Sequence, residues 1–135
     1  MKRSALAIMG ICIGGAAMAD NVEGVDEMIC AASQVQVCIE YDRCYAATPA
    51  DLDVPQFVVI NTDDNTISTT EASGENRSTK FESVQRSEGV IYLQGIEGGR
   101  SFSFVIHEAS GQMTVAVARD GIAVSVFGAC TDADI

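Results

Sequence analysis

Residues 101–126 carry the clearest signal for the fold, and they read SFSFVIHEASGQMTVAVARDGIAVSV. Apolar residues alternate with small or polar residues in three successive runs, which is the period-two pattern of strands with one buried face. Ser110-Gly111 separates the first two runs. Asp120-Gly121 separates the last two and favours a type I′ hairpin, because both residues tolerate a positive φ. The stretch therefore predicts three antiparallel strands in a meander.

The same alternation extends towards the N-terminus and beyond residue 126. After residue 19, Val and Ile together occur 23 times and Leu only twice, a bias that favours strands over helices. We expect eight short strands, at residues 34–41, 56–61, 66–70, 80–86, 90–94, 101–107, 112–118 and 122–129. Tight turns between them predict an all-β antiparallel meander that curls into a closed or partly closed barrel, with a two-layer sandwich as the alternative.

Two segments depart from the strand pattern. Thr48 is a typical N-cap, proline follows at the first helical position, and Asp51 completes a capping box, so one short helical turn is predicted near Thr48–Leu52. Residues 21–32 carry apolar residues at helical spacing, which predicts either a short helix or an extended acidic arm.

Residues 1–19 have the features of a secretory signal peptide. Two basic residues precede an uncharged run, and Ala17-Met18-Ala19 places small residues at the positions that signal peptidase recognises, which predicts cleavage after Ala19. The uncharged run of 15 residues is shorter than the ~20 needed to cross a bilayer, so no membrane span is expected in the mature chain. Residues 20–135 are expected to form a single disulfide-stabilised β-domain.

Four of the five cysteines follow the expected cleavage site: Cys30, Cys38, Cys44 and Cys130. An even number in an exported chain indicates two disulfides. Three pairings are possible, and we favour Cys38–Cys44, which closes a small loop, together with Cys30–Cys130, which ties the two ends of the domain. A zinc site is a weak alternative, because the chain has no C-x-x-C pair and one histidine.

The chain is acidic. It has 19 Asp and Glu against 8 Lys and Arg, and removal of Lys2 and Arg3 leaves six basic residues and a formal charge of −13. This charge argues against nucleic acid or anionic lipid as a partner, because both require a basic face. It fits either a basic partner, such as an envelope or host protein, or solubility in a saline environment.

No group of residues has the pattern of a catalytic site. His107, the single histidine, is expected on the solvent face of its strand, and Ser101 and Ser103 lie in that strand rather than on the strained turn of a nucleophile elbow. Residues 95–100 lack the Lys-Ser/Thr of a phosphate-binding loop and predict a glycine-rich hairpin with Arg100 on the next strand. We therefore expect no enzymatic activity and no cofactor.

Two pairs of carboxylates are weak candidates for a metal site. Asp51 and Asp53 follow the expected helical turn, and Asp63 and Asp64 lie in a hairpin loop. A hard cation such as calcium would be bound only if these loops met, since it requires six to eight oxygen ligands. Solvated turn carboxylates are the default interpretation.

Several segments resemble a group of small exported proteobacterial proteins. These are the signal peptide, PADLDVPQF (49–57), IYLQGIEGGRSFSFVI (91–106), SGQMTVAV (110–117) and VFGACT (126–131), with LQGIEGGRSFS and FGACT the most specific. The resemblance implies a disulfide-containing β-domain in the periplasm of a Gram-negative bacterium, and it carries over no activity and no catalytic residue.

These observations predict a periplasmic or secreted, non-enzymatic binding or interaction module. One alternative is a small barrel that carries an apolar ligand, which requires more interior volume than an eight-stranded barrel filled by its own side chains offers. Another alternative is an acidic inhibitor of a basic enzyme such as lysozyme, a hypothesis based on size, export, acidity and β-architecture.

Overall fold

The computed structural model describes residues 21–134, so the expected signal peptide and its cleavage after Ala19 lie outside the described residues. Within residues 21–134 the chain forms ten strands and two 3₁₀ turns. They are β1 (Glu27–Ile39), β2 (Cys44–Ala47), η1 (Pro49–Leu52), β3 (Phe57–Asn61), β4 (Thr66–Thr69), η2 (Glu71–Ser73), β5 (Ser78–Lys80), β6 (Ser83–Ser87), β7 (Val90–Glu97), β8 (Arg100–His107), β9 (Gln112–Arg119) and β10 (Ile122–Asp132). No helix in this part of the chain has the length and apolar character needed to cross a membrane.

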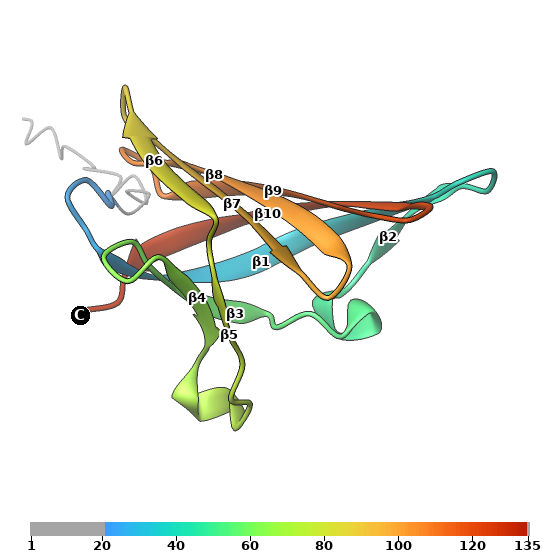
Figure 1. The fold of residues 1–135 in the computed structure, drawn as a ribbon, viewed down its shortest axis with the longest axis horizontal. Coiled ribbons are helices and arrows are strands. Elements are labelled where there is room, and N and C mark those ends of the chain that lie inside the picture. Colours follow the sequence, from blue (N-terminus) through green and yellow to red (C-terminus); the bar gives the residue numbers. More distant parts are fainter. Residues whose placement is uncertain (1–20, 135) are drawn as a thin grey trace, which may run out of the picture.

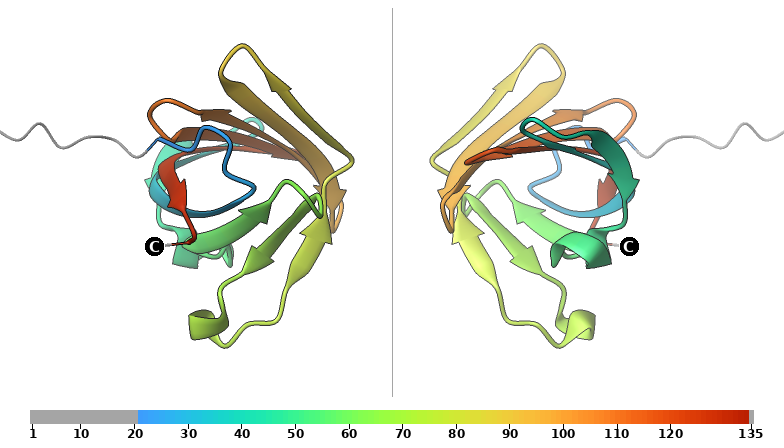
Figure 2. Two further views of the ribbon diagram at one scale, coloured as in Figure 1. Left: turned by 90° about the vertical axis from the view of Figure 1, so that its left-hand side faces the viewer. Right: turned by 90° about the vertical axis from the view of Figure 1, so that its right-hand side faces the viewer.

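The strands form one antiparallel sheet in the order β5-β4-β3-β1-β10-β9-β8-β7-β6, with β2 paired to β1 beside this path (Figure 1). The end-on views of Figure 2 show that the sheet curls into a half-barrel. The predicted all-β, antiparallel and partly closed architecture is therefore confirmed. Each of the eight expected strands is present, and the strand expected at 80–86 is divided into β5 and β6.

The two ends of the sheet are consecutive in sequence. Only Phe81 and Glu82 separate β5 from β6. The Phe81 N–H donates to the carbonyl oxygen of Asn65 at 2.7 Å, before β4, and the Glu82 N–H donates to that of Gln94 in β7 at 2.8 Å. The backbone therefore passes from one end of the curled sheet to the other within two residues.

Strand β1 joins the two parts of the sheet and contains a β-bulge. It pairs with β10 along one edge and with both β2 and β3 along the other, and Ser33 is the extra residue in its register with β10. Before the bulge Cys30 points inward, and after it Val35 does, so the buried positions change from even to odd numbers. Gly128 lies opposite, where a Cβ would fall on the carbonyl oxygen of Ala31.

One sequence expectation is wrong at this point, and one strand, β2, is absent from the expected set. Residues 21–32 form neither a helix nor an arm: residues 21–26 are a loop, and β1 begins at Glu27. The bulge interrupts the alternation, so the first half of the strand does not continue the pattern of the second. Strand β2 was not expected, because its four residues are exposed or half-buried and show no alternation.

The helical turn expected near Thr48–Leu52 is present as η1 and is closed by a capping box. The Thr48 hydroxyl accepts a hydrogen bond from the Asp51 N–H at 3.3 Å, and the Asp51 carboxylate accepts one from the Thr48 N–H at 3.0 Å. Hydrogen bonds from the backbone and side chain of Thr48 lower the pKa of Asp51. The ionised carboxylate therefore holds the turn at neutral pH, and this contribution is lost as the pH falls through the lowered pKa.

The hairpin at Asp120-Gly121 is present, but its expected type I′ geometry is wrong. Gly121 has a φ of +74°, whereas Asp120 has no positive φ, because glycine alone supplies the left-handed position. Glu88-Gly89 and Gly98-Gly99 instead place both turn residues at positive φ, as a type I′ turn requires.

One end of the half-barrel is filled by large apolar side chains. The fully buried residues include Val22, Met28, Ile60, Ile91, Leu93 and Ile106. The loop of residues 21–26 covers this end, where the Val22 N–H donates to the carbonyl oxygen of Glu108 at 2.8 Å. Arg86 forms an ion pair with Glu108 at 3.0 Å, the only ion pair among residues 21–134, and donates to the carbonyl oxygen of Val25. We call this the closed end.

Both disulfides start from β1 and follow the pairing that the sequence favoured. Cys30 bonds to Cys130 on β10, and Cys38 bonds to Cys44 on β2. In each case the two cysteines are directly opposite in the strand register. The first closes a sequence separation of 100 residues and the second a separation of 6.

Removing the long-range disulfide should destabilise the protein more than removing the short-range one. In the loop-entropy model C30A/C130A loses about 4–5 kcal/mol and C38A/C44A about 2 kcal/mol of unfolding free energy. Urea unfolding of the two double variants measures both losses. Equal losses of unfolding free energy, or a larger loss for C38A/C44A, would contradict the larger stabilising role given to Cys30–Cys130. A C30A/C130A variant that is already unfolded without urea would support that role.

Candidate functional site

The concave face of the half-barrel is apolar and surrounds a cavity. Alternation along β8, β9 and β10 places one set of side chains on this face, and β3–β5 with η1 form the opposite wall. The cavity has a volume of about 260 Å³ and opens to solvent at the end away from the loop of residues 21–26. Its apolar lining includes Val35, Val37, Phe102, Val115, Val117 and Val124.

The cavity exists because the two ends of the interior are filled by side chains of different size. Ile, Leu and Met fill the closed end, whereas valine dominates the β9 and β10 positions around the cavity. An interior filled by its own side chains was the expectation from strand number, and the short valine side chains explain why it is not filled. The volume is near the lower limit of ligand pockets, about 300 Å³, and apolar cavities of about 150 Å³ already hold benzene.

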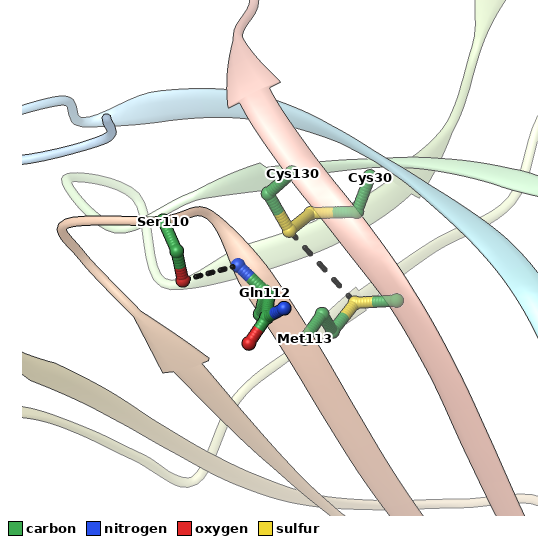
Figure 3. Close-up of a disulfide and its surroundings, with 5 residues drawn as sticks. All are labelled: Cys30, Ser110, Gln112, Met113 and Cys130. Carbon is green, nitrogen blue, oxygen red and sulfur yellow. Dashed lines mark hydrogen bonds between the residues drawn. A yellow bond between two sulfur atoms is a disulfide. The ribbon is translucent and has the colours of Figure 1, made fainter. Parts of the chain in front are cut away.

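The Cys30–Cys130 disulfide lies beside the cavity, next to Met113. Figure 3 shows the Sδ atom of Met113 beside the disulfide, 3.8 Å from the Sγ atom of Cys130. Cys30 and Met113 both line the cavity, and all three residues are buried. The covalent bond between β1 and β10 therefore fixes the two strands at the base of the site.

Three phenylalanines pack together beside the cavity, where the two ends of the sheet meet. Phe81, Phe102 and Phe104 pack edge to face, with ring centroids 5.8–5.9 Å apart, a favoured arrangement of aromatic rings. Phe102 lies across Gly95, its partner on β7, where an added Cβ would be 2.5 Å from its Cζ atom. Glycine at position 95 therefore makes room for the ring of Phe102.

The charged residues of the lining are Arg77, Arg100, Arg119 and one carboxylate, Glu97. Arg100 and Arg119 lie at the mouth, at one end of β8 and β9, whereas Arg77 donates to the carbonyl oxygen of Asp53 at 3.4 Å. The sequence correctly placed Arg100 on the strand after the glycine-rich turn but did not assign it to a site. The signal was its spacing from Phe102 and Phe104, since residues two and four apart on a strand share a face.

The single histidine is exposed, and the structure separates it from the two serines considered with it. His107 ends β8, and its Nδ1 atom lies 3.4 Å from the Oγ atom of Ser110 in the following turn. Ser101 and Ser103 are six and four residues away along the same strand, which corresponds to roughly 20 and 13 Å. The geometry therefore brings neither serine to the histidine.

The four candidate metal-binding carboxylates lie at opposite ends of β3. Asp51 belongs to η1 and Asp53 is its C-cap, whereas Asp63 and Asp64 follow the strand, with their N–H groups bonded to the Oδ1 atom of Asn61. The structure brings no three His, Cys, Asp or Glu side chains of residues 21–134 together as metal ligands.

Comparisons with protein-family models, with curated proteins and with solved structures find no match for this chain. The geometry of the cavity is therefore the basis for a proposed function.

Gly95→Ala should destabilise the protein through the ring of Phe102. The new methyl group and the ring compete for one space, which costs about 1–3 kcal/mol of unfolding free energy. In a Phe102→Leu background the same change should cost much less, because the smaller side chain leaves room. Urea unfolding of the two single variants and the double variant measures this coupling. An equal cost of Gly95→Ala in both backgrounds would refute the contact.

Proposed function

We propose that this protein is an exported, non-enzymatic binding module that holds an apolar small molecule in the concave face of its half-barrel. The observation that carries the proposal is the open cavity of about 260 Å³ with a lining of valine and phenylalanine. Several lining residues, among them Phe102, Val117 and Val124, are only partly buried. A ligand that covers them gains about 0.8 kcal/mol for each buried methylene group.

Export to the periplasm is part of the same proposal. Two disulfides between neighbouring strands suit an oxidising compartment, and so does the signal-like sequence of residues 1–19. The resemblance to small exported proteobacterial proteins points in the same direction. Inhibition of a basic enzyme remains a hypothesis that rests on the net charge of the chain.

The test uses N-phenyl-1-naphthylamine, a neutral probe whose fluorescence increases in apolar surroundings. The oxidised protein should bind it at one site, and straight-chain alcohols should displace it, each added methylene tightening binding about fourfold until the cavity is full. Val117→Phe, which fills the cavity, should weaken probe binding at least tenfold.

Ala116→Phe is the matched control, because residue 116 is exposed on the other face of the same strand. It should leave probe binding unchanged, and thermal unfolding checks that both variants fold. Absence of probe binding to the unmodified protein, or equal binding by both variants, would refute the proposed function.

A further inference from the structure

We infer that the ligand is a single-chain amphiphile with one anionic head group, of the medium-chain fatty acid class, and that Arg100 binds the head group at the mouth of the cavity. This inference rests on the proposed function and adds the chemistry of the ligand to it. The evidence for this ligand is the orientation, the pairing and the neighbours of the arginines that line the cavity.

Arg100 and Arg119 are neighbours on the same face of the sheet. They flank the last register pair of β8 and β9, Ser101 with Ala118, and both line the cavity. Like charges on adjacent strands repel each other, so this arrangement costs free energy unless an anion lies between them. Neither strand carries a carboxylate between the two arginines: Glu97 lies on β7, on the other side of Arg100, and Asp120 lies in the turn after Arg119.

Arg100 also lacks a partner of its own. Its Nε atom is buried and has no hydrogen-bond partner, and the guanidinium lies beside the turn at Gly98, where an added Cβ would be 3.9 Å from a terminal nitrogen. Glu97 is opposite in register but forms no ion pair with it, since the one ion pair of residues 21–134 is Arg86 with Glu108. The Nε–H of Arg100 is a buried donor without an acceptor, which is costly, and a ligand carboxylate supplies the acceptor.

The distribution of charge selects an anion over a cation. Residues 21–134 contain six basic side chains, and three of them, Arg77, Arg100 and Arg119, line this one cavity with a single carboxylate. The rest of the chain is acidic, and Asp120 directly follows Arg119. At 0.15 M salt, charges more than ~8 Å away are largely screened, so the three guanidiniums and the few acids beside them set the potential in the cavity. Half of the six basic side chains of residues 21–134 thus line the cavity in which a head group would lie.

The size and shape of the cavity select a single alkyl chain. Most of the lining is apolar, with Ser68, Thr69, Ser78 and Thr79 of the opposite wall among its few polar members, and Cys30 and Met113 line it beside the disulfide. A volume of about 260 Å³ suits one chain of medium length rather than a two-chain lipid. The head group then lies at Arg100 and the tail on the valines.

Decanoate and decanol test the inference, because they share the alkyl chain and differ in the head group. In displacement of N-phenyl-1-naphthylamine at pH 7.5, the unmodified protein should bind decanoate at least tenfold more tightly than decanol. Arg100→Gln should reduce decanoate binding about 10- to 100-fold, the effect of losing a hydrogen bond to a charged group, and leave decanol binding unchanged.

Lys80→Gln is the matched control. It removes one positive charge at an exposed position outside the cavity and should preserve the preference for decanoate. Glu97→Gln removes the acid at the mouth and should tighten decanoate binding several-fold. If Arg100→Gln folds poorly, Arg119→Gln removes the neighbouring positive charge instead. It should also reduce the preference for decanoate over decanol.

Equal binding of decanol and decanoate by the unmodified protein, or an undiminished preference in both arginine variants, would overturn the inference and leave the proposed function standing. Failure of the naphthylamine probe and of both alkyl ligands to bind would overturn the proposed function itself.

An unchanged or higher melting temperature of Arg100→Gln would support a ligand-binding role, because an unpaired buried donor contributes no stability. A melting temperature lowered by Arg100→Gln together with unchanged decanoate binding would assign the residue a structural role instead.

Discussion

The whole fold depends on the pairing of strand β1 along both of its edges. One edge is hydrogen-bonded to β10 along its length, and the other is shared by β2 and β3. A strand with partners on both sides brings the first and last parts of the chain together, and the two disulfides fix it to β10 and β2. Because the sheet is continuous through β1, the meander of β6–β10 and the shorter arm of β3–β5 face each other across one interior (Figure 2).

The function we propose follows from the unequal filling of that interior. Large aliphatic side chains and the loop of residues 21–26 fill one end, and Arg86 holds that loop in place. Valines line the other end, where the unpaired Arg100 and its neighbour Arg119 lie at the mouth. The apolar wall and the cationic rim together have the chemical character of a site for an amphiphile, whereas an apolar wall alone would suit a neutral molecule.

The sequence predicted most of the fold because its signals are local. Alternation and turn residues located every strand except β2, with β5 and β6 predicted as one strand, and Thr48 with Asp51 identified η1. The bulge at Ser33 hid the first half of β1, because it reverses which side chains face inward. Strand β2 has exposed or half-buried residues at every position and gave no pattern.

Less of the candidate site than of the fold could be predicted from the sequence. The cavity depends on the volumes of side chains from strands far apart in the chain, and their pairing through β1 is non-local. The position of Arg100 on the concave face follows from its spacing to Phe102, but its lack of a partner depends on the geometry of the β7–β8 turn.

We propose that the concave face is an open ligand site, whereas the closed end is a solid core. Methyl-resolved NMR during titration with decanoate distinguishes the two ends of the interior. We expect the methyl resonances of Val35, Val117 and Val124 to shift together and saturate, whereas those of Ile60 and Ile106 do not move. Shifts confined to outward-facing residues such as Val105 and Ile96, or no shifts at all, would contradict it.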